Sequence, residues 1–323
     1  MTYFILRRLI QTVIVFICLS FVCYYLMTLM PGDPVDLMIS SNPKISSADI
    51  ARLRSLYGLD QPVYARYMNW MSSIASGDLG YSRTYRIPVA ELIGPRLMNT
   101  FYLSLLSLIL SLVISIPLGI WSALHAGKKT DYLINFFSLA GISVPSFWLG
   151  IVLIIGFAVK FPILPAGGTF TVGLENADFF TILKDRMTYL ILPTLSLSYL
   201  QIGRFVRFTR SSMLDALRND YIRTAKAKGL NANTIIWRHA FRNALIPLIT
   251  IIALSFSTLF SGALITETVF AYQGVGKLVN ESIIGNDYNV AMVAFMITVS
   301  MVLIFNLIAD ILYGVADPRI SFS

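Results

Sequence analysis

Charged residues, histidine and cysteine are all scarce in this sequence. Only 13% of the 323 residues are Asp, Glu, Lys or Arg, roughly half the share of a typical soluble domain, whereas 56% are hydrophobic. So few charges cannot form the polar coat of a soluble protein, and the composition therefore indicates that lipid covers much of the surface. The two cysteines, Cys18 and Cys23, lie inside an apolar run, and we assign them no role.

Motifs of catalysis and of nucleotide binding are absent as well. The nearest approach to a Walker A loop, AGKKT at Ala126–Thr130, has Ser122 where the upstream glycine belongs. The two histidines, His125 and His239, occur without HExxH or CxxC spacing, so no metal site is expected. Ionisable residues inside apolar runs, which ion-driven transporters use, are nearly missing too. We predict a non-catalytic membrane protein that binds no cofactor or metal and has no energy source of its own.

Long apolar runs are what the sequence has in abundance. A helix needs about 20 mainly apolar residues to cross a bilayer. Six windows meet this requirement: Leu9–Met30, Thr100–Leu124, Tyr132–Val159, Tyr189–Val206, Leu245–Thr266 and Val290–Tyr313. We therefore predict an all-α, polytopic membrane helix bundle with about six transmembrane helices. The predicted regions are a first helix with a long outer segment (1–94), a five-helix core (95–313) and a tail (314–323).

Basic residues are concentrated in alternate connections between these windows. Arg7 and Arg8 precede the first window, Lys128 and Lys129 follow the second, and the connection 207–243 is strongly basic. Short cytoplasmic loops carry such an excess of Lys and Arg, so both termini and this connection are predicted to be cytoplasmic. The net charge of +8 is then a matter of topology rather than of nucleic-acid binding. The apolar run after Arg8 exceeds the ~7–15 residues of a signal-peptide core, which predicts a retained first span.

The basic connection is predicted to form two helices that protrude from the membrane. A helix over Asp220–Lys228 ends at Gly229, and Asn231 or Asn233 caps the helix that follows. A small side chain such as Ala225 would let the backbone of another protein approach closely. Because the chain lacks a motor, we interpret this protrusion as the place where a separate motor binds. The alternative is a basic loop that only fixes the topology.

The outer connection between the first two windows, 31–99, is also too long for a simple turn. Three short helices are expected in it: one through Ile50–Leu56, a second through Tyr64–Trp70 and a third over Val89–Ile93. Ser46 or Ser47 caps the first helix, Gly58 ends it, and Pro62 opens the second. Amphipathic helices with Tyr and Trp favour a membrane interface, so the segment is either a lid on the headgroups or a docking surface.

Pro145 interrupts the third window. Proline removes one helical hydrogen bond, and Ser143, Ser146 and Trp148 lie close to it in the sequence. Two interpretations remain open at this point, namely a packed kink and a gate or lining of a transport path.

The segment Asp220–Pro247 resembles the cytoplasmic coupling loop of ABC importer permeases. It reads DYIRTAKAKGLNANTIIWRHAFRNALIP. It is most similar to the first-permease subunit of the peptide branch, which includes dipeptide, oligopeptide, glutathione and nickel systems. Other pieces agree in order along the chain: PGDP at Pro31–Pro34, YGLDQPV at Tyr57–Val63, SVPSFWLG at Ser143–Gly150, ETVFAYQGVGKL at Glu267–Leu278 and ADPRI at Ala316–Ile320. The resemblance thus extends over residues 31–320.

The chain departs from the family pattern in two places. The wider family has Glu-Ala-Ala, three residues and then Gly in the coupling loop, whereas here Arg223, Thr224 and Ala225 precede Gly229. A glutamate contact with the motor is therefore not expected. Gln273 stands where the branch usually has proline before glycine, and a slightly looser outer turn is expected there without loss of function.

The resemblance implies a type I ABC importer permease fold and the translocation subunit of an ATP-driven importer. Di- or oligopeptides are the expected solutes, with nickel or glutathione as the alternative. The resemblance also implies two cytoplasmic ABC ATPase subunits that bind ATP and Mg²⁺, a second homologous permease that completes a heterodimer, and an extracytoplasmic solute-binding protein. The expected location is the plasma (inner) membrane of a prokaryote, in contact with lipid and not with nucleic acid.

Roles for particular residues follow from the same resemblance. The residues expected to couple the chain to the ATPases are Arg218, Asp220, Tyr221, Arg223, Thr224, Ala225, Lys226, Lys228, Gly229 and Asn231. The expected gate or path consists of Ser143, Pro145, Ser146 and Trp148. The residues expected to contact the binding protein are Tyr64, Tyr67, Trp70, Tyr272 and Gln273.

Two other classes of function are kept as alternatives. A self-sufficient secondary transporter would need ionisable residues or ion sites at broken helices inside the membrane, and the one candidate here is Asp310, near the end of the last window. A membrane-embedded enzyme would need a polar catalytic cluster at the ends of the spans, which this sequence does not suggest. Gradient-driven uptake or substrate turnover by the purified chain alone would favour these classes.

Overall fold

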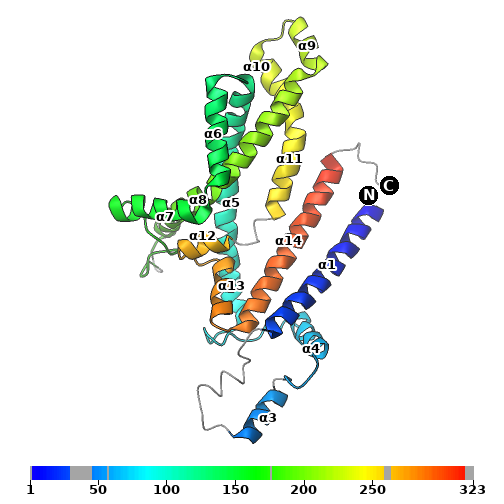
Figure 1. Ribbon diagram of the computed structural model, residues 1–323, viewed down its shortest axis with the longest axis vertical. Coiled ribbons are helices and arrows are strands. Elements are labelled where there is room, and N and C mark those ends of the chain that lie inside the picture. Colours follow the sequence, from blue (N-terminus) through cyan, green and yellow to red (C-terminus); the bar gives the residue numbers. More distant parts are fainter. Residues whose placement is uncertain (1, 30–45, 57, 175–176, 258–262, 317–323) are drawn as a thin grey trace. The chain divides into compact units, whose positions relative to one another are not determined.

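The computed structural model of the chain describes residues 2–29, 46–56, 58–174, 177–257 and 263–316. Helices form nearly all of its regular structure, as predicted, and the β-type pairing among these residues is an isolated bridge between Tyr81 and Pro88 (Figure 1). The chain divides into two compact units, one of residues 96–277 with 301–323 and one of residues 2–95 with 278–300. The PGDP motif, and ADPRI beyond Ala316, lie outside the described residues.

Three described helices are long and apolar enough to cross a membrane, and a bent pair brings the number to four if it forms one span. The three are α1 (Thr2–Thr28), α5 (Val89–Leu124) and α14 (Tyr288–Ala316). The fourth predicted window is helical within α8 (Phe179–Arg218), and residues 245–257 of the fifth are helical within α11 (Arg242–Ser257); residues 258–262 of the fifth window lie outside the described part of the chain. Neither helix is among those spans. The number of six spans therefore stays a prediction.

The third window is broken at Pro145, where the sequence predicted an interruption. It forms α6 (Lys129–Ser143) and α7 (Ser146–Ile154), with a bend of 97° between them, and α7 continues into the π-helical segment η1 (Ile155–Lys160). The bend lies at Pro145. This residue cannot donate a helical hydrogen bond, and it forces the preceding Val144 into an extended conformation with ψ of 123°.

The third short outer helix also differs from the prediction. Val89–Ile93 is not a separate element but the first part of α5, which runs without interruption to Leu124. The physical reason lies at the junction, where Gly94 does not take the positive φ that would end a helix.

Helices α5, α6 and α8 pack closely in the unit formed by residues 96–277 and 301–323. A Cβ atom on Gly141 would lie 2.9 Å from the carbonyl oxygen of Tyr199, and one on Gly203 would collide with the carbonyl oxygen of Ser138. On the other side of α8, a Cβ atom on Gly119 would lie 2.5 Å from Cβ of Thr209. Small residues let helices approach in this way where lipid provides no hydrophobic drive for association.

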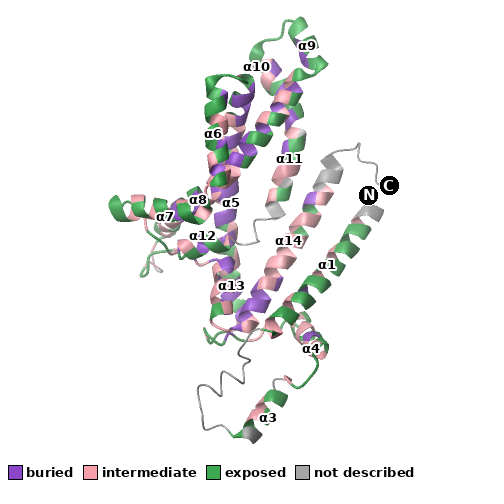
Figure 2. Ribbon diagram, viewed as in Figure 1, coloured by how far each residue is buried: buried purple, intermediate pink, exposed green. Residues whose placement is uncertain are grey.

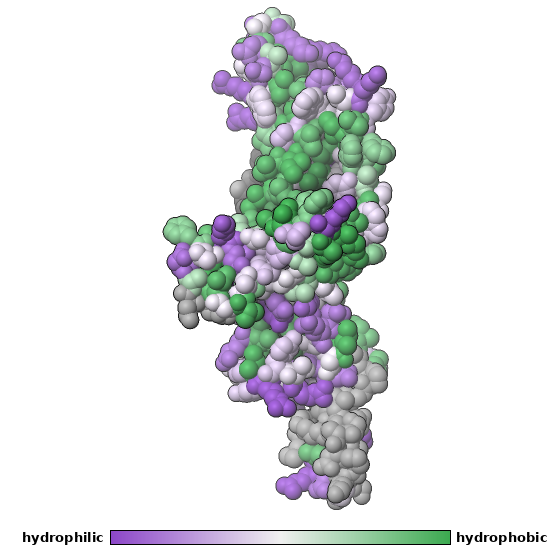
Figure 3. Space-filling model, turned by 90° about the vertical axis from the view of Figure 1, so that its left-hand side faces the viewer, coloured by the Kyte–Doolittle hydropathy of each residue, from purple (hydrophilic) through white to green (hydrophobic). Residues whose placement is uncertain are grey.

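Large apolar side chains are exposed on the outward face of α6, on α7 and along α1 (Figure 2). On α6, Tyr132, Leu133, Phe136 and Phe137 are each more than half exposed. So much exposed apolar surface on these helices is unfavourable in water and suits the hydrocarbon of a bilayer. Figure 3 shows the same contrast on one face, with hydrophilic residues gathered at the end that carries α9 and α10 and an apolar band beside them.

In the other unit, the predicted outer helices are present as α3 (Ser47–Leu56) and α4 (Val63–Ala75). Ser46 is the residue that caps α3, since its hydroxyl accepts a hydrogen bond from the Asp49 amide at 3.2 Å. Gly58 follows with φ of 64°, and Pro62 stands at the N-cap of α4. These three local predictions are confirmed.

The segment between α4 and α5 is fastened to the start of α14. The Asp287 carboxylate accepts hydrogen bonds from the Ser82 hydroxyl at 2.6 Å and from the Thr84 amide at 3.0 Å. The side-chain amide of Asn289 donates to the carbonyl of Leu79 at 3.0 Å, where Gly80 leaves no room for a Cβ atom. The segment between α4 and α5 is therefore held in place within this unit by specific hydrogen bonds.

Candidate coupling site

The basic connection forms the helix, glycine turn and helix that we predicted. α9 (Asp220–Ala227) follows α8 after one extended residue, Asn219. Gly229 has φ of 73°, and the amide of Leu230 donates to the carbonyl of Ala225 at 3.3 Å, which closes the C-terminus of α9. Asn231 is the cap of the next helix, because its side chain accepts from the Thr234 amide at 2.8 Å.

The chain after this cap continues as a succession of helical segments. α10 (Ala232–Thr234) passes into the π-helical segment η2 (Ile235–Phe241) and then into α11. The turn between α9 and α10 lies at the tip of the unit in Figure 1. The predicted protrusion thus has well-defined ends on both sides of Gly229.

One face of α9 is buried against the chain itself. Ile222 is 1% exposed and Ala225 is 4% exposed. They pack in an apolar cluster, called here the base cluster, with Ile120, Ala123, Met213, Ala216, Ile235, Ala240 and Ala244. The expectation that Ala225 contacts another protein is therefore wrong, because α9 needs this small residue to lie close to α8 and η2.

The opposite face of α9 is exposed and basic. The predicted coupling residues that lie on the surface are Arg218, Asp220, Tyr221, Arg223, Thr224, Lys226, Lys228, Gly229 and Asn231. A guanidinium nitrogen of Arg223 lies 3.3 Å from an Asp220 carboxylate oxygen, but both side chains are more than 80% exposed, so this pair stabilises the helix little. α9 thus exposes a cationic surface on one side and packs against the base cluster with the other.

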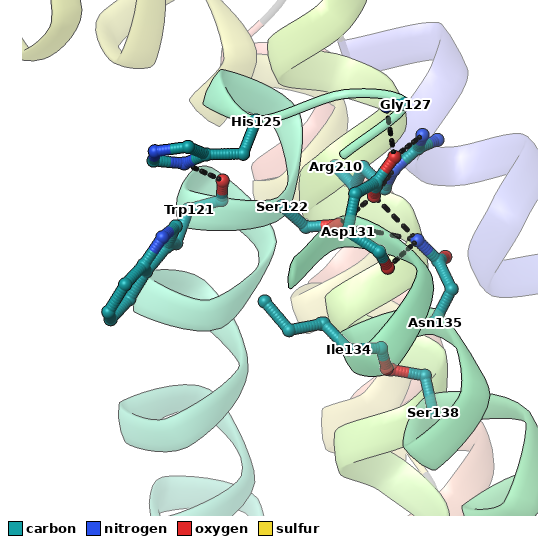
Figure 4. A network of polar contacts seen from close by, with 9 residues as sticks. All are labelled: Trp121, Ser122, His125, Gly127, Asp131, Ile134, Asn135, Ser138 and Arg210. Atoms are coloured by element: carbon teal, nitrogen blue, oxygen red, sulfur yellow. Dashed lines mark hydrogen bonds and ion pairs between the residues drawn. The ribbon is translucent and has the colours of Figure 1, made fainter. Parts of the chain in front are cut away.

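A polar network that sequence reasoning missed joins α5, α6 and α8 (Figure 4). The Arg210 guanidinium donates two hydrogen bonds of 2.7 Å to the two carboxylate oxygens of Asp131, which is 3% exposed. The same carboxylate accepts from the Ser122 hydroxyl and from the Gly127 amide. The available signal was an acidic residue directly before the third window and an arginine shortly after the fourth.

The four predicted gate residues all lie at the bend between α6 and α7. Ser143 and Pro145 are exposed and Trp148 is 53% exposed, whereas Ser146 is half-buried. The carbonyl of Ser146 accepts a hydrogen bond of 2.8 Å from the hydroxyl of Ser196 on α8. The bend is therefore tied to α8, and its remaining polar and aromatic groups face outward from this chain.

The predicted docking residues on α4 do not share one face. Tyr64 is 65% exposed, whereas Tyr67 is 3% exposed, and its hydroxyl forms a hydrogen bond of 2.6 Å with Ser20 of α1. Trp70 is half-buried beside Tyr24 and Tyr67. The expectation that Tyr67 contacts another protein is wrong, because its ring and hydroxyl fasten α4 to α1.

The predicted docking residues after the fifth window are largely buried as well. Tyr272 is 3% exposed, and its hydroxyl donates to the Asn99 carbonyl at 3.1 Å. Burial, together with the nearby Glu267 carboxylate, raises the pKa of the Tyr272 phenol, which stays neutral. Gln273 is half-buried, and the Gly274 amide closes the turn around it by donating to the Tyr272 carbonyl at 2.8 Å. Tyr272 therefore serves packing and not docking.

Glu267 is the centre of this outer turn, a role that sequence reasoning also missed. It belongs to α12 (Leu264–Val269) and is fully buried. Its carboxylate accepts from the Thr100 hydroxyl at 2.7 Å and from the Lys277 amide at 2.9 Å, which caps α13 (Val275–Ile284). A Cβ atom on Gly274 would collide with this carboxylate, so the glycines of the GVG sequence make room for it.

Comparison with protein families gives matches over nearly the whole chain. Residues 115–322 match the model described as binding-protein-dependent transport system inner membrane component. Residues 1–103 match the corresponding N-terminal model of the transport system membrane component.

Curated relatives are similar over their full length. The chain is 41% identical over 323 residues to the oligopeptide transport system permease protein AppB of Bacillus subtilis, with all of both chains covered. It is 35% identical to the dipeptide transport system permease protein DppB of Escherichia coli and to the di/tripeptide transport system permease protein DppB of Pseudomonas aeruginosa, with 99% of each chain covered.

A solved structure of the MetNI methionine ABC transporter, described as inward facing, shares the fold. The match has a TM-score of 0.56 at 16% identity and covers 71% of this chain and 97% of the other. The all-helical ABC importer permease fold expected from the sequence is thereby confirmed. The chain is a multi-pass inner-membrane protein and a transporter permease subunit, not an enzyme, and it belongs to the family of binding-protein-dependent transport system inner membrane components.

Proposed function

We propose that the chain is the translocation subunit of an importer for di- or oligopeptides that is driven by ATP hydrolysis on separate subunits. The observation that carries this proposal is the construction of α9, whose cationic surface stands on a buried apolar base. Because α9 is fixed in this way, a force on its exposed face is transmitted to the helices packed against its buried face. The relatives named for oligopeptides, dipeptides and di/tripeptides support the peptide class of solute.

The complete transporter then contains this chain, a second homologous permease, two cytoplasmic ABC ATPases that bind ATP and Mg²⁺, and an outer solute-binding protein. In this proposal both termini and α9 lie in the cytoplasm of a prokaryote, which the excess of Lys and Arg in these connections supports. Closure of the ATPases on ATP moves α9 as a rigid body and switches the access of the path. The proposal keeps the division into a first helix with its long connection (1–94), a five-helix core (95–313) and a tail (314–323).

The bend between α6 and α7 supplies the proposed path. Ser143, Pro145 and Trp148 are exposed on the isolated chain, as a surface shared with a second permease would be. On the proposed outer side, Tyr64 is the most exposed of the residues proposed to contact the binding protein, whereas Trp70 and Gln273 are half-buried.

Cross-linking to the ATPase tests the coupling site directly. In a background with Cys18 and Cys23 replaced by Ser, Lys226→Cys should cross-link to an ATPase subunit of the purified complex. Val172→Cys is the matched control, because Val172 is 87% exposed in the connection predicted to lie on the outer side. Efficient cross-linking of the control, or none from Lys226→Cys in an assembled complex, would contradict the proposed site.

Uptake by the reconstituted complex tests the solute class. We expect ATP-dependent accumulation of labelled di- and oligopeptides in the presence of the binding protein, and none of Ni²⁺ or glutathione. Accumulation of Ni²⁺ or glutathione instead would assign the solute to the other systems of the branch. Gradient-driven uptake by the purified chain without ATPases would favour a secondary transporter.

A further inference from the structure

The Asp131 carboxylate joins three helices at one point (Figure 4). Asp131 lies in the first turn of α6, Arg210 lies on α8, and Ser122 lies in the last turn of α5. Besides the two bonds from Arg210, the carboxylate accepts from the Asn135 side-chain amide at 2.7 Å and from the Gly127 amide at 2.9 Å. This number of donors holds the carboxylate in one position, and the parallel pair from Arg210 adds a fixed orientation.

The pair lies between the coupling helix and the bent helix of the proposed path. Arg210 precedes the end of α8 at Arg218 by about two helical turns, and α9 begins directly beyond that end. On the other partner, α6 runs from Asp131 to the bend at Pro145. The ion pair is therefore placed where a displacement of α9 and α8 passes to α6.

Two other close contacts between α6 and α8 are non-directional. They involve Gly141 against Tyr199 and Gly203 against Ser138, which bring the two backbones together without a polar bond between side chains. Such packing resists separation of the helices more strongly than sliding or rotation. A bidentate ion pair restricts both motions, because its two hydrogen bonds survive only in one relative orientation.

A simpler explanation is that the pair only stabilises the fold. A buried ion pair is often no better for stability than apolar residues of the same volume, because both groups lose their hydration. A binding site for an anion is also excluded as the main role, because Nε and one Nη of Arg210 are already directed at Asp131. The arrangement is better suited to fixing one geometry than to adding stability.

We propose that Asp131 and Arg210 are positioning residues that hold α6 and α8 in register, so that movement of α9 reaches the bend between α6 and α7. This inference rests on the proposed role of α9 as the site of coupling. It extends that role to two residues that neither contact the ATPase nor line the proposed path. Through this pair, a displacement of α9 moves α6 and the bend between α6 and α7.

Three variants separate positioning from stability in the reconstituted complex. Asp131→Asn leaves the Arg210 charge without its partner and should lower the melting temperature of the complex. The double variant Asp131→Asn/Arg210→Gln removes both charges and should regain most of that stability. Arg210→Lys keeps the charge but loses the two-pronged geometry. Asp178→Asn is the control, since it makes the same chemical change at an exposed cap at the other end of α8.

The decisive measurement is the number of solute molecules transported per ATP hydrolysed. We expect this ratio to fall by roughly fivefold to tenfold in the double variant and in Arg210→Lys, with ATPase activity within about twofold of the unaltered complex. Asp178→Asn should leave the ratio unchanged. A double variant that regains both its stability and its transport ratio would show a purely structural pair and overturn the proposal.

The cross-link from Lys226→Cys separates this proposal from the function on which it rests. If that cross-link forms at the usual yield in the double variant while the transport ratio falls, the coupling site is intact and the positioning role is supported. If the cross-link never forms in any assembled complex, the proposed coupling site is itself wrong and the positioning role falls with it.

Discussion

Gly229 offers the sharpest test of the coupling site, because glycine is required there only by the backbone conformation and not by lack of space for a side chain. Its φ is 73°, a region where residues other than glycine cost about 1–2 kcal/mol. A Cβ atom added there would meet no other atom within 4 Å, so no clash accompanies the conformational cost. A penalty of this size shifts the equilibrium between the closed turn and opened forms by roughly 5–30-fold.

A graded series of substitutions uses this property. Gly229→Asn should be mild because asparagine tolerates the left-handed region, and Gly229→Val should be clearly worse because it is β-branched. Gly229→Pro should be the most severe, since proline fixes φ near −65° and removes the amide that donates to the Lys226 carbonyl at 3.0 Å. The expected order of lost transport is therefore Asn, Val and Pro, with membrane insertion retained throughout.

The assay is stimulation of ATPase activity by solute-loaded binding protein in the reconstituted complex, together with uptake. Loss of stimulation should increase in the order Asn, Val and Pro. The amount of permease in the membrane should be the same for all three variants. Equal effects of Asn and Val would refute the argument from φ. Stimulation that survives Gly229→Pro would refute the assignment of this turn to coupling.

Three further predictions concern how the helices are held together, and each is read from the melting temperature of the purified complex. Ile222→Ala should destabilise α9 by about 2–5 kcal/mol, since it leaves a cavity in the base cluster, and an unchanged melting temperature would show that the cluster does not support α9. Gly203→Ala should cost about 1–3 kcal/mol, because its methyl group collides with Ser138; Gly156→Ala, which meets nothing within 4 Å, is the control and should melt normally. Tyr67→Phe should cost about 1 kcal/mol by removing the buried hydrogen bond to α1, and a variant as stable as the parent would contradict the role given to that hydroxyl.

Features that depend on neighbours in the chain were predicted correctly from sequence. The stop at Gly229, the cap at Asn231 and the entry of α4 at Pro62 each follow from the φ or hydrogen-bonding preference of one residue. Family membership was equally accessible, because motifs spaced along the whole chain carried it. Such signals are local or linear and need no knowledge of which helices meet.

Orientation of individual side chains was much less accessible. Tyr67, Tyr272 and Ala225 were expected on contact surfaces, and all three are buried. An aromatic or small residue on an amphipathic helix suits both an outer and an inner face, and the choice is made by the helix that packs against it. For Tyr67 that partner is Ser20, which lies 47 positions away in the chain.

The sequence by itself determined the membrane class, the helical content, the family and the helix–glycine–helix form of the coupling loop. Tertiary structure alone decided the 97° direction change at Pro145, the burial of Glu267 and the meeting of Asp131 with Arg210. The physical reason is that a proline specifies where a helix breaks but not the angle that packing imposes. An isolated charge likewise becomes a buried pair only when distant helices bring its partner within hydrogen-bonding distance.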